Sequence, residues 1–212
     1  MTIVLLVRHG QNDYIGKRLA GRLPGVHLND EGLKQAQTVA QTLKELPIKS
    51  IYSSPLERAI ETARPLADIK SLPVIINHAL LEVDFGHWTG MTQQEMESQS
   101  MWHTVQTNPI DMRFPGGESF SEAQERITKG LFEIISLYDK NEIIVCFSHS
   151  DAIKLAITSA LSVSINSFQK LIINPASISI LNFTANRNYL VCTNWQPSLA
   201  GSLPAEIFPA SP

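Results

Sequence analysis

The chain has 212 residues, of which 43% are hydrophobic and 17% are charged, and its formal net charge at pH 7 is −3. This length and apolar content fit one α/β domain with a full core. The balanced charge excludes the basic face that nucleic acid requires and the polybasic anchor that a membrane surface requires, so we expect a small-molecule partner.

The sequence begins with strands and helices in alternation, a pattern typical of βαβ units and a largely parallel sheet. Residues 2–7 are apolar and predict the first strand. A helix is predicted after Asn29 or Asp30, which are both good N-caps, and Pro47 ends its periodic pattern.

The second strand, predicted at residues 50–53, leads into the stretch SSPLER. This stretch carries a helix-start signal, with Ser54 as N-cap, Pro55 at the first helical position and Glu57 completing a capping box. Arg58 is therefore expected in the first turn of this helix.

The middle of the chain is less regular. Residues 74–76 predict a short strand, and the glycines and aromatic residues of EVDFGHWTG predict a loop after it. Residues from about 91 to 115 form the least regular part of the sequence. We interpret them as an excursion from the core that acts as a lid. FPGGES ends this lid excursion, because paired glycines permit a tight turn, and Ser119 with Glu122 predicts another capping box.

A long amphipathic helix is predicted after Ser119. The apolar run EIIVCFS then predicts a strand that ends in a histidine, His149, much as the first strand ends in the triplet RHG. Asp151 is expected to cap the next helix, over residues 152–161.

The end of the chain predicts a hairpin and a tail. Residues 178–183 and 189–195 form the hairpin, at an edge of the sheet. We expect residues 1–195 to form a single domain. Residues 196–212 contain four prolines and predict a loosely ordered tail.

The cysteines and the apolar runs bear on the cellular compartment in which the protein is expected. Cys146 and Cys192 lie far apart, without the spacing of a zinc site or of a disulfide-rich domain, which is typical of reduced proteins. The first apolar run is too short for a signal-peptide core, and no later run approaches a membrane span. We therefore expect a cytoplasmic protein.

Cationic and titratable side chains occur at the sheet edge where ligands bind in open parallel sheets. They are Arg8 with His9, Arg58 and His149. Each alone has an ordinary structural explanation, such as a solvated surface charge. Two arginines that face one pocket repel each other, however, and phosphate matches their planar donors best. The combination predicts a phosphate site, and a metal is disfavoured beside two guanidinium charges.

Five stretches resemble the histidine phosphatase superfamily, which includes the phosphoglycerate mutases. They are LLVRHG, SSPLERAIETA, LLEVDFGHWTG, FPGGES and VCFSHSD, in the order and approximate spacing of that family. The resemblance spans about residues 3–183. It implies a phosphoglycerate mutase-like fold, a three-layer α/β/α sandwich with a mostly parallel sheet.

The resemblance implies a role for each cationic or titratable residue named above. His9 matches the nucleophile, whose neutral imidazole attacks phosphorus and forms a phosphohistidine. Arg8, Arg58 and His149 match the residues that hold the phosphoryl oxygens and offset their charge in the transition state. The arginines then replace a magnesium ion, so no metal or organic cofactor is expected.

Other positions match the acid and the substrate contacts of the family. Glu82 matches the carboxyl group that protonates the leaving oxygen, and Asp84 is the second choice for that role. Gly21 and Ser150 are expected to bind the substrate. Tyr14 and Ser150 depart from the usual family pattern at positions that border the pocket, which leaves the identity of the substrate open.

Hydrolysis and mutase transfer share the phosphohistidine and differ in whether water or a second substrate hydroxyl takes the phosphoryl group. A mutase must exclude water, which asks for a closed site with extra basic groups. Apart from histidines, the only basic residue between Val83 and Phe114 is Arg113, and the excursion is shorter than the insertion of glycolytic mutases. We therefore predict a phosphatase, with a phosphoglycerate mutase as the alternative.

A third hypothesis is a non-catalytic phosphate-binding protein. Such a protein needs the arginines but is free to lose His9 or Glu82, and the sequence retains both. The expected partner is a small phosphorylated metabolite, such as a sugar phosphate, a phosphoglycerate or the nucleotide-loop phosphate of a cobamide precursor. The oligomeric state stays open, with a homodimer as one option.

Overall fold

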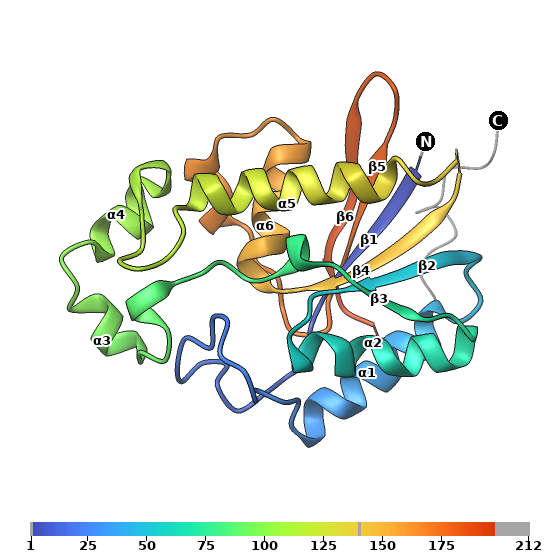
Figure 1. The fold of residues 1–212 in the computed structure, drawn as a ribbon, viewed down its shortest axis with the longest axis horizontal. Coiled ribbons are helices and arrows are strands. Elements are labelled where there is room, and N and C mark those ends of the chain that lie inside the picture. The colour runs from blue at the N-terminus through green and yellow to red at the C-terminus, as the bar shows by residue number, and fades with distance from the viewer. Residues whose placement is uncertain (1, 140, 198–212) are drawn as a thin grey trace.

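The computed structural model describes residues 2–139 and 141–197, which form one six-stranded sheet with helices on both faces (Figure 1). The strands are β1 (Thr2–Arg8), β2 (Ile48–Ser53), β3 (Val74–Ile76), β4 (Ile143–Ser148), β5 (Ile178–Phe183) and β6 (Asn188–Trp195). Their order is β3-β2-β4-β1-β5-β6. The first four run parallel, whereas β5 and β6 are antiparallel to their neighbours, as the predicted edge hairpin requires.

The helices complete an α/β/α sandwich, as predicted. They are α1 (Asp30–Leu43), α2 (Glu57–Lys70), α3 (Gln93–Glu97), α4 (Trp102–Thr107), α5 (Phe120–Ile135) and α6 (Ser150–Ala160), with short 3-10 turns η1 (His78–Leu80), η2 (Gly86–Trp88), η3 (Pro109–Asp111) and η4 (Ile165–Lys170). In the part of the chain that the structure describes, no helix combines the length and the apolar character needed to cross a membrane.

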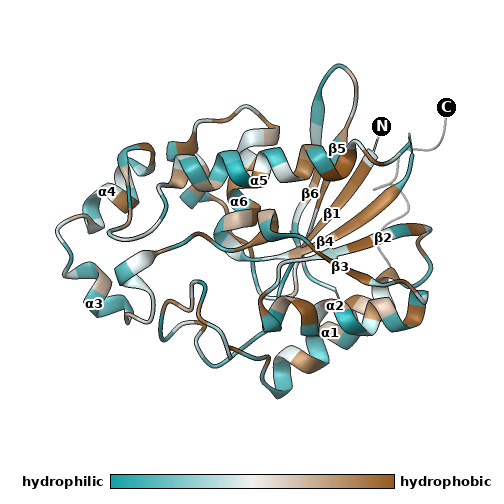
Figure 2. Cartoon of the chain, viewed as in Figure 1, coloured by the Kyte–Doolittle hydropathy of each residue, from teal (hydrophilic) through white to brown (hydrophobic). Residues whose placement is uncertain are grey.

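Each face of the sheet has its own apolar core, because successive side chains of a strand point to opposite faces. Val4 and Leu6 of β1 pack in the cluster that includes α5 and α6. Leu5 and Val7 pack in the other cluster, with α1 and α2. The hydrophobic central strands in Figure 2 therefore mark a sheet that is covered on both sides.

Two of the four predicted helix starts are confirmed. The Asn29 side chain caps α1 by accepting a hydrogen bond from its first turn, and Ser119 with Glu122 forms the capping box of α5. The expectation for Asp151 is wrong. His149 occupies the N-cap position of α6, and Asp151 already lies inside the first turn.

The predicted capping box at Ser54 is also wrong. Helix α2 begins at Glu57, and its N-cap, Leu56, has no side-chain bond to the helix. The Ser54 N–H donates instead to the carbonyl oxygen of Phe147 (2.9 Å), which keeps the chain extended beside β4. The Glu57 carboxylate accepts from the Gly25 N–H (3.0 Å) and does not turn back toward Ser54. Arg58 nevertheless lies in the first turn, as predicted.

The lid excursion at 91–115 contains the short elements α3, α4 and η3. Val105, Met112 and Phe114 are buried in the same cluster as α5 and α6, so the excursion packs on the body of the protein. Of the predicted tail, residues 198–212 lie outside the part that the structure describes.

Candidate active site

The two histidines that follow strands lie beside each other. Strands β1 and β4 are parallel neighbours, with Arg8 opposite Ser148, so both strands end at the same edge of the sheet. The His9 N–H donates to the Ser148 carbonyl oxygen (3.0 Å). The ring centroids of His9 and His149 are 5.2 Å apart.

Glycines set the path of the chain after His9. The Gly10 N–H donates to Thr62 Oγ1 (3.0 Å), which ties this loop to α2. A Cβ at Gly10 would stand 2.8 Å from the Gly32 carbonyl oxygen, and one at Gly32 would stand 2.0 Å from the Gln11 carbonyl oxygen. Both positions need glycine because the loop passes directly over the first turn of α1.

Hydrogen bonding fixes which nitrogen of His9 is free. His9 Nδ1 lies 2.8 Å from the Gly10 carbonyl oxygen, and because a carbonyl only accepts, Nδ1 carries the proton. In the neutral ring Nε2 then keeps its lone pair. Burial, with the nearby charges of Arg58 and Arg8, holds the pKa of His9 well below its ordinary value. The His9 ring is therefore neutral at pH 7 and has the form of a nucleophile.

The second histidine, His149, is fully buried. Its Nε2 lies 2.8 Å from Ser54 Oγ, and its Nδ1 has no hydrogen-bond partner among the described residues. Burial and the charge of Arg58 also hold the pKa of His149 well below its ordinary value. Ser54, which the sequence assigned to a helix cap, therefore fixes the orientation of this ring.

Arg8 and Arg58 bring two guanidinium groups to the same place without a carboxylate partner among the described residues. Arg8 Nη1 donates to the Ile173 carbonyl oxygen (2.5 Å), and Arg58 Nη2 donates to the Gly21 carbonyl oxygen (2.6 Å). Arg8 Nε and Arg58 Nε and Nη1 are buried with no partner in the described part of the chain. Burial lowers the pKa of both groups. These unused donors suit an anionic ligand.

Glu82 is the carboxyl group that faces these cations. Its Oε1 accepts from the N–H groups of Val83 (3.0 Å) and Ala152 (3.1 Å), the second of which belongs to the first turn of α6. Burial and the charge of Asp151 raise the pKa of Glu82. A raised pKa favours the protonated form, which a general acid needs.

A pocket of about 200 Å³ joins these groups. Six of the predicted site residues line it, namely Arg8, His9, Gly21, Arg58, Glu82 and Ser150. His149 is not part of the wall but lies against the ring of His9. Asp84 is not part of the wall either, because its carboxylate lies near the Gly86 N–H (3.0 Å) and Arg22 (3.6 Å). Of the two candidate acids, the structure therefore brings Glu82 to the pocket.

Sequence reasoning missed several lining residues. Asn12 is buried, its Oδ1 accepts from the N–H groups of Tyr14 and Ile15, and its Nδ2 has no partner in the described part of the chain. Arg18 lines the pocket and donates to the Gly90 carbonyl oxygen (2.9 Å). Asn12 follows the RHG triplet by two positions, and that proximity is the signal that could have found it.

A neutral histidine between two arginines, opposite a buried carboxyl group, is the constellation of a phosphoryl-transfer site. The sequence matches the model of the histidine phosphatase superfamily (branch 1) over residues 4–196. The chain belongs to this superfamily.

Its relatives in sequence include both phosphatases and a mutase. Phosphoserine phosphatase 1 of Hydrogenobacter thermophilus is 31% identical over 202 residues, which cover 92% of each chain. A 2,3-bisphosphoglycerate-dependent phosphoglycerate mutase of Thermoplasma acidophilum is 28% identical over 190 residues, which cover 88% of this chain and 90% of the mutase.

Solved structures of phosphatases share the fold. Phosphoserine phosphatase of Entamoeba histolytica, solved as a mutant with phosphoserine, is 27% identical with a TM-score of 0.82, and the match covers 92% of this chain and 97% of that one. A mycobacterial glucosyl-3-phosphoglycerate phosphatase, solved with VO3, is 25% identical with a TM-score of 0.83, and the match covers 92% and 99%.

Proposed function

We propose that this protein is a metal-independent phosphomonoesterase that acts on a small phosphorylated metabolite through a phosphohistidine on His9. The observation that carries the proposal is the pair of guanidinium groups beside a neutral His9, with Arg58 buried and Arg8 partly buried, neither of which has a carboxylate partner among the described residues. A phosphoryl group supplies the missing negative charge.

The reaction proceeds in two steps. His9 Nε2 attacks phosphorus while the bond from phosphorus to the ester oxygen breaks, and Glu82 gives its proton to that oxygen. The Glu82 carboxylate then takes a proton from water, the water oxygen attacks phosphorus, and the phosphorus–nitrogen bond breaks to release phosphate and neutral His9. Arg8, Arg58 and His149 hold the phosphoryl oxygens in both steps, and Gly21 and Ser150 contact the substrate.

The lid excursion favours hydrolysis over mutase transfer. Apart from histidines, the basic residue of this excursion is Arg113. It forms an ion pair with the Glu122 carboxylate and donates a hydrogen bond to the Gly117 carbonyl oxygen. Arg113 is therefore not free to retain a bisphosphorylated intermediate. The phosphoserine and glucosyl-3-phosphoglycerate phosphatases among the relatives support the same conclusion, and the Thermoplasma mutase keeps phosphoglycerate mutase as the alternative.

The test is a substrate panel with EDTA present. Phosphate release is measured from phosphoserine, 3-phosphoglycerate, glucosyl-3-phosphoglycerate and sugar phosphates, beside a coupled assay for conversion of 3-phosphoglycerate to 2-phosphoglycerate with bisphosphoglycerate primer. We expect release without isomerisation. Isomerisation with little release would establish the mutase, and tight phosphate binding with neither activity would establish a binding protein.

We also propose that residues 1–195 act as one catalytic domain and that 91–115 is its lid. Bonds from the start of the excursion to the pocket loop support this, since the Leu19 N–H donates to the Met91 carbonyl oxygen (2.8 Å) and the Gly90 N–H donates to the Leu19 carbonyl oxygen (2.7 Å). Limited proteolysis that leaves a shorter, stable and active core would contradict this division.

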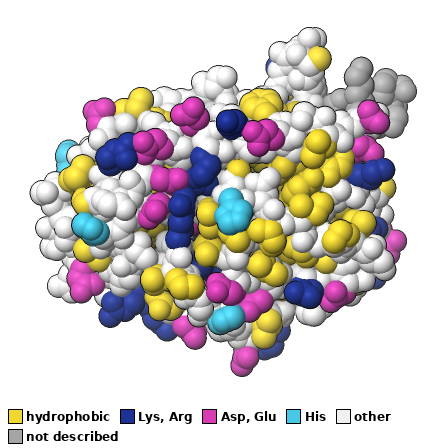
Figure 3. All heavy atoms as spheres, viewed as in Figure 1, with side chains coloured by type: hydrophobic (Ala, Val, Ile, Leu, Met, Phe, Trp, Pro, Cys, Tyr) yellow, Lys and Arg dark blue, Asp and Glu magenta, His cyan; other side chains and the backbone are white. Residues whose placement is uncertain are grey.

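A homodimer is supported by the β3 edge of the sheet, which pairs with no further strand among the described residues. Strand β3 ends the strand order, and Ile75 and Ile76 are 39% and 43% exposed. Ile69 of α2 is 42% exposed as well. Figure 3 shows an apolar area on the side of the molecule where α2 and β3 lie in Figure 1. Exposed apolar edges pair readily with another strand. We expect light scattering to give a dimer that Ile76→Lys converts to a monomer, and a monomeric wild type would overturn the proposal.

A cytoplasmic location is supported by the thiols, since Cys146 and Cys192 are both free. Cell fractionation tests it, and recovery of the protein in a secreted fraction would contradict it.

A further inference from the structure

The main chain that carries Glu82 is held by side chains. Arg126 Nη1 donates to the carbonyl oxygens of Ala79 (2.7 Å) and Leu81 (3.1 Å), and the Ser148 hydroxyl donates to that of Leu80 (2.7 Å). Residues 81–85 belong to neither a strand nor a helix, so no regular backbone pairing fixes the position of Glu82.

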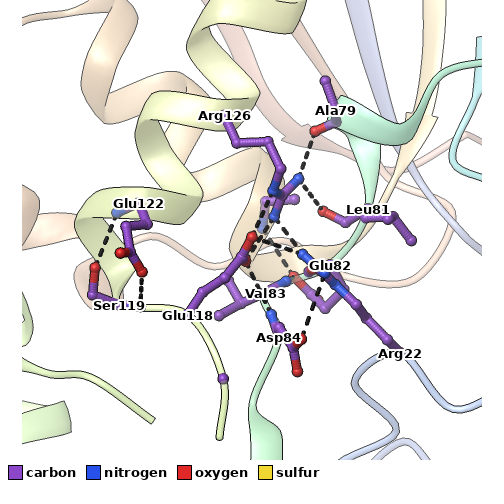
Figure 4. Close-up of polar contacts among 12 residues, drawn as sticks. Arg22, Ala79, Leu81, Glu82, Val83, Asp84, Glu118, Ser119, Glu122 and Arg126 are labelled. Carbon is purple, nitrogen blue, oxygen red and sulfur yellow. Dashed lines mark hydrogen bonds and ion pairs between the residues drawn. The ribbon is translucent and has the colours of Figure 1, made fainter.

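The Glu82 carbonyl oxygen itself accepts from two arginines (Figure 4). Arg22 Nε donates to it at 2.8 Å and Arg126 Nη2 at 3.3 Å. Arg22 comes from the loop that forms one wall of the pocket, and Arg126 comes from α5. Two distant segments therefore meet at the residue proposed as the acid.

Glu118 joins the two arginines to each other. Its carboxylate lies 2.9 and 3.0 Å from Arg126 Nε and Nη2 and 2.9 Å from Arg22 Nη2. Its main and side chains also bind Asp84, because the Glu118 N–H donates to the Asp84 carbonyl oxygen (2.9 Å) and the Asp84 N–H donates to Glu118 Oε2 (3.1 Å). Glu118 thus closes a ring of contacts around the stretch that carries Glu82.

We infer that Arg22, Glu118 and Arg126 are positioning residues for proton transfer by Glu82. The inference rests on the proposed function, in which Glu82 is the acid. Arg22 directly follows Gly21, whose carbonyl oxygen accepts from Arg58. The same network therefore fixes the acid relative to the arginine that holds the phosphoryl group, and small errors in such geometry are costly in rate.

Leaving groups of different basicity separate positioning of the acid from general structural damage. A phosphomonoester of an aliphatic alcohol, such as phosphoserine, needs a proton on its leaving oxygen. The leaving group of p-nitrophenyl phosphate departs as a stable phenolate and needs little protonation by an acid. The readout is kcat/KM for both esters, measured with wild type, Glu82→Gln, Glu118→Gln and the matched control Glu122→Gln. Glu122 lies in the first turn of α5, close in sequence to Glu118, and also pairs with an arginine, but its partners are Arg113 and Ser119.

We expect Glu118→Gln to lower kcat/KM for phosphoserine by about tenfold to a hundredfold and to change kcat/KM for p-nitrophenyl phosphate by less than about threefold. Glu82→Gln shows the same selectivity with a larger loss, and Glu122→Gln changes neither value. Equal losses on both esters in Glu118→Gln, or no loss, would overturn the inference.

Two further comparisons keep the outcomes distinct. If Glu118→Gln does not fold, Arg126→Lys replaces it, since this change keeps the charge and removes the forked donors. An Arg126→Lys protein without selective loss would equally overturn the inference. Failure of wild type to hydrolyse either ester, or of Glu82→Gln to discriminate between them, would instead contradict the proposed function.

Discussion

Two pairs of arginines lie close to the pocket in opposite electrostatic situations. Arg22 and Arg126 share the carboxylate of Glu118, and each also donates to carbonyl oxygens of the stretch that carries Glu82, while Arg22 Nη1 lies 3.6 Å from the Asp84 carboxylate. Arg8 and Arg58 each have one carbonyl partner, and three of their nitrogens are buried with none in the described part of the chain. A buried charge without a partner destabilises a folded protein, so the second pair is explained by a ligand and the first by the fold.

The difference teaches how a phosphate site can be recognised before any ligand is seen. The paired arginines stabilise a stretch of irregular backbone. The unpaired arginines retain the donors that a phosphoryl group would use, and they also lower the pKa of His9. Exchange of an unpaired arginine should therefore lower activity without lowering stability, whereas exchange of a paired arginine should lower stability as well.

The largest expected effect comes from the unpaired side. Arg58→Met should lower kcat/KM by about 10²–10³-fold, because it removes donors to the phosphoryl oxygens, and should leave the thermal midpoint of the free enzyme unchanged or raised. Inorganic phosphate should raise the midpoint of wild type and not that of the variant. The control is Arg64→Met, an exposed position of the same helix, which should change neither property. Normal turnover in Arg58→Met would break the comparison.

The paired side should lose stability in addition to the proton transfer that it is inferred to position. Arg126→Met removes the ion pair between Arg126 and the Glu118 carboxylate, and it removes the hydrogen bonds that Arg126 donates to the Ala79 and Leu81 carbonyl oxygens. We expect the free energy of unfolding in urea to fall by about 2 kcal/mol. Arg113→Met removes an exposed ion pair and should leave the urea midpoint unchanged. A variant at Arg126 as stable as wild type would show that the two pairs do not differ in the way described.

The smallest and most specific effect concerns the pH profile of kcat/KM. The pKa of His9 is lowered from 6.5, so the ring stays neutral, and the acid limb should lie well below pH 6.5. The pKa of Glu82 is raised from 4.5, so the proton needed by the leaving oxygen is retained above that pH and is lost as the pH rises through the raised pKa.

Glu82→Gln identifies the basic limb. With the same substrate, ionisation of the phosphate is common to both enzymes, so the difference between the two profiles reports on Glu82. We expect the part of the basic limb that is due to Glu82 to be present in the wild-type profile and absent from the profile of the variant, which also has a lower overall rate. An unchanged basic limb would assign the limb to another group.

The sequence predicted the parts of the site that follow from strand ends. Arg8, His9 and His149 come directly after apolar runs, and parallel pairing of β1 and β4 brings them together. The largely parallel sheet followed from the alternation of strands and helices, and the three-layer architecture followed from the resemblance to the histidine phosphatase superfamily. These features were predictable because their signals are local and periodic.

The remaining features depend on contacts that no local pattern contains. Ser54 carries every sign of a helix cap, yet its pairing with β4 keeps it extended and turns its hydroxyl toward His149. Arg22 and Arg126 look like ordinary polar residues in the sequence. Their importance arises only because the folded chain presents free carbonyl oxygens around Glu82.

The most direct test of the central claim is to trap the phosphoryl group on the enzyme. The enzyme is mixed with phosphoserine, or with the best ester of the panel, in the presence of EDTA, quenched at alkaline pH and digested for mass spectrometry. We predict an acid-labile phosphoryl group on the peptide that contains His9, and its absence from a folded His9→Ala variant that has lost turnover. A phosphoryl group on another residue, or undiminished turnover by His9→Ala, would contradict the account.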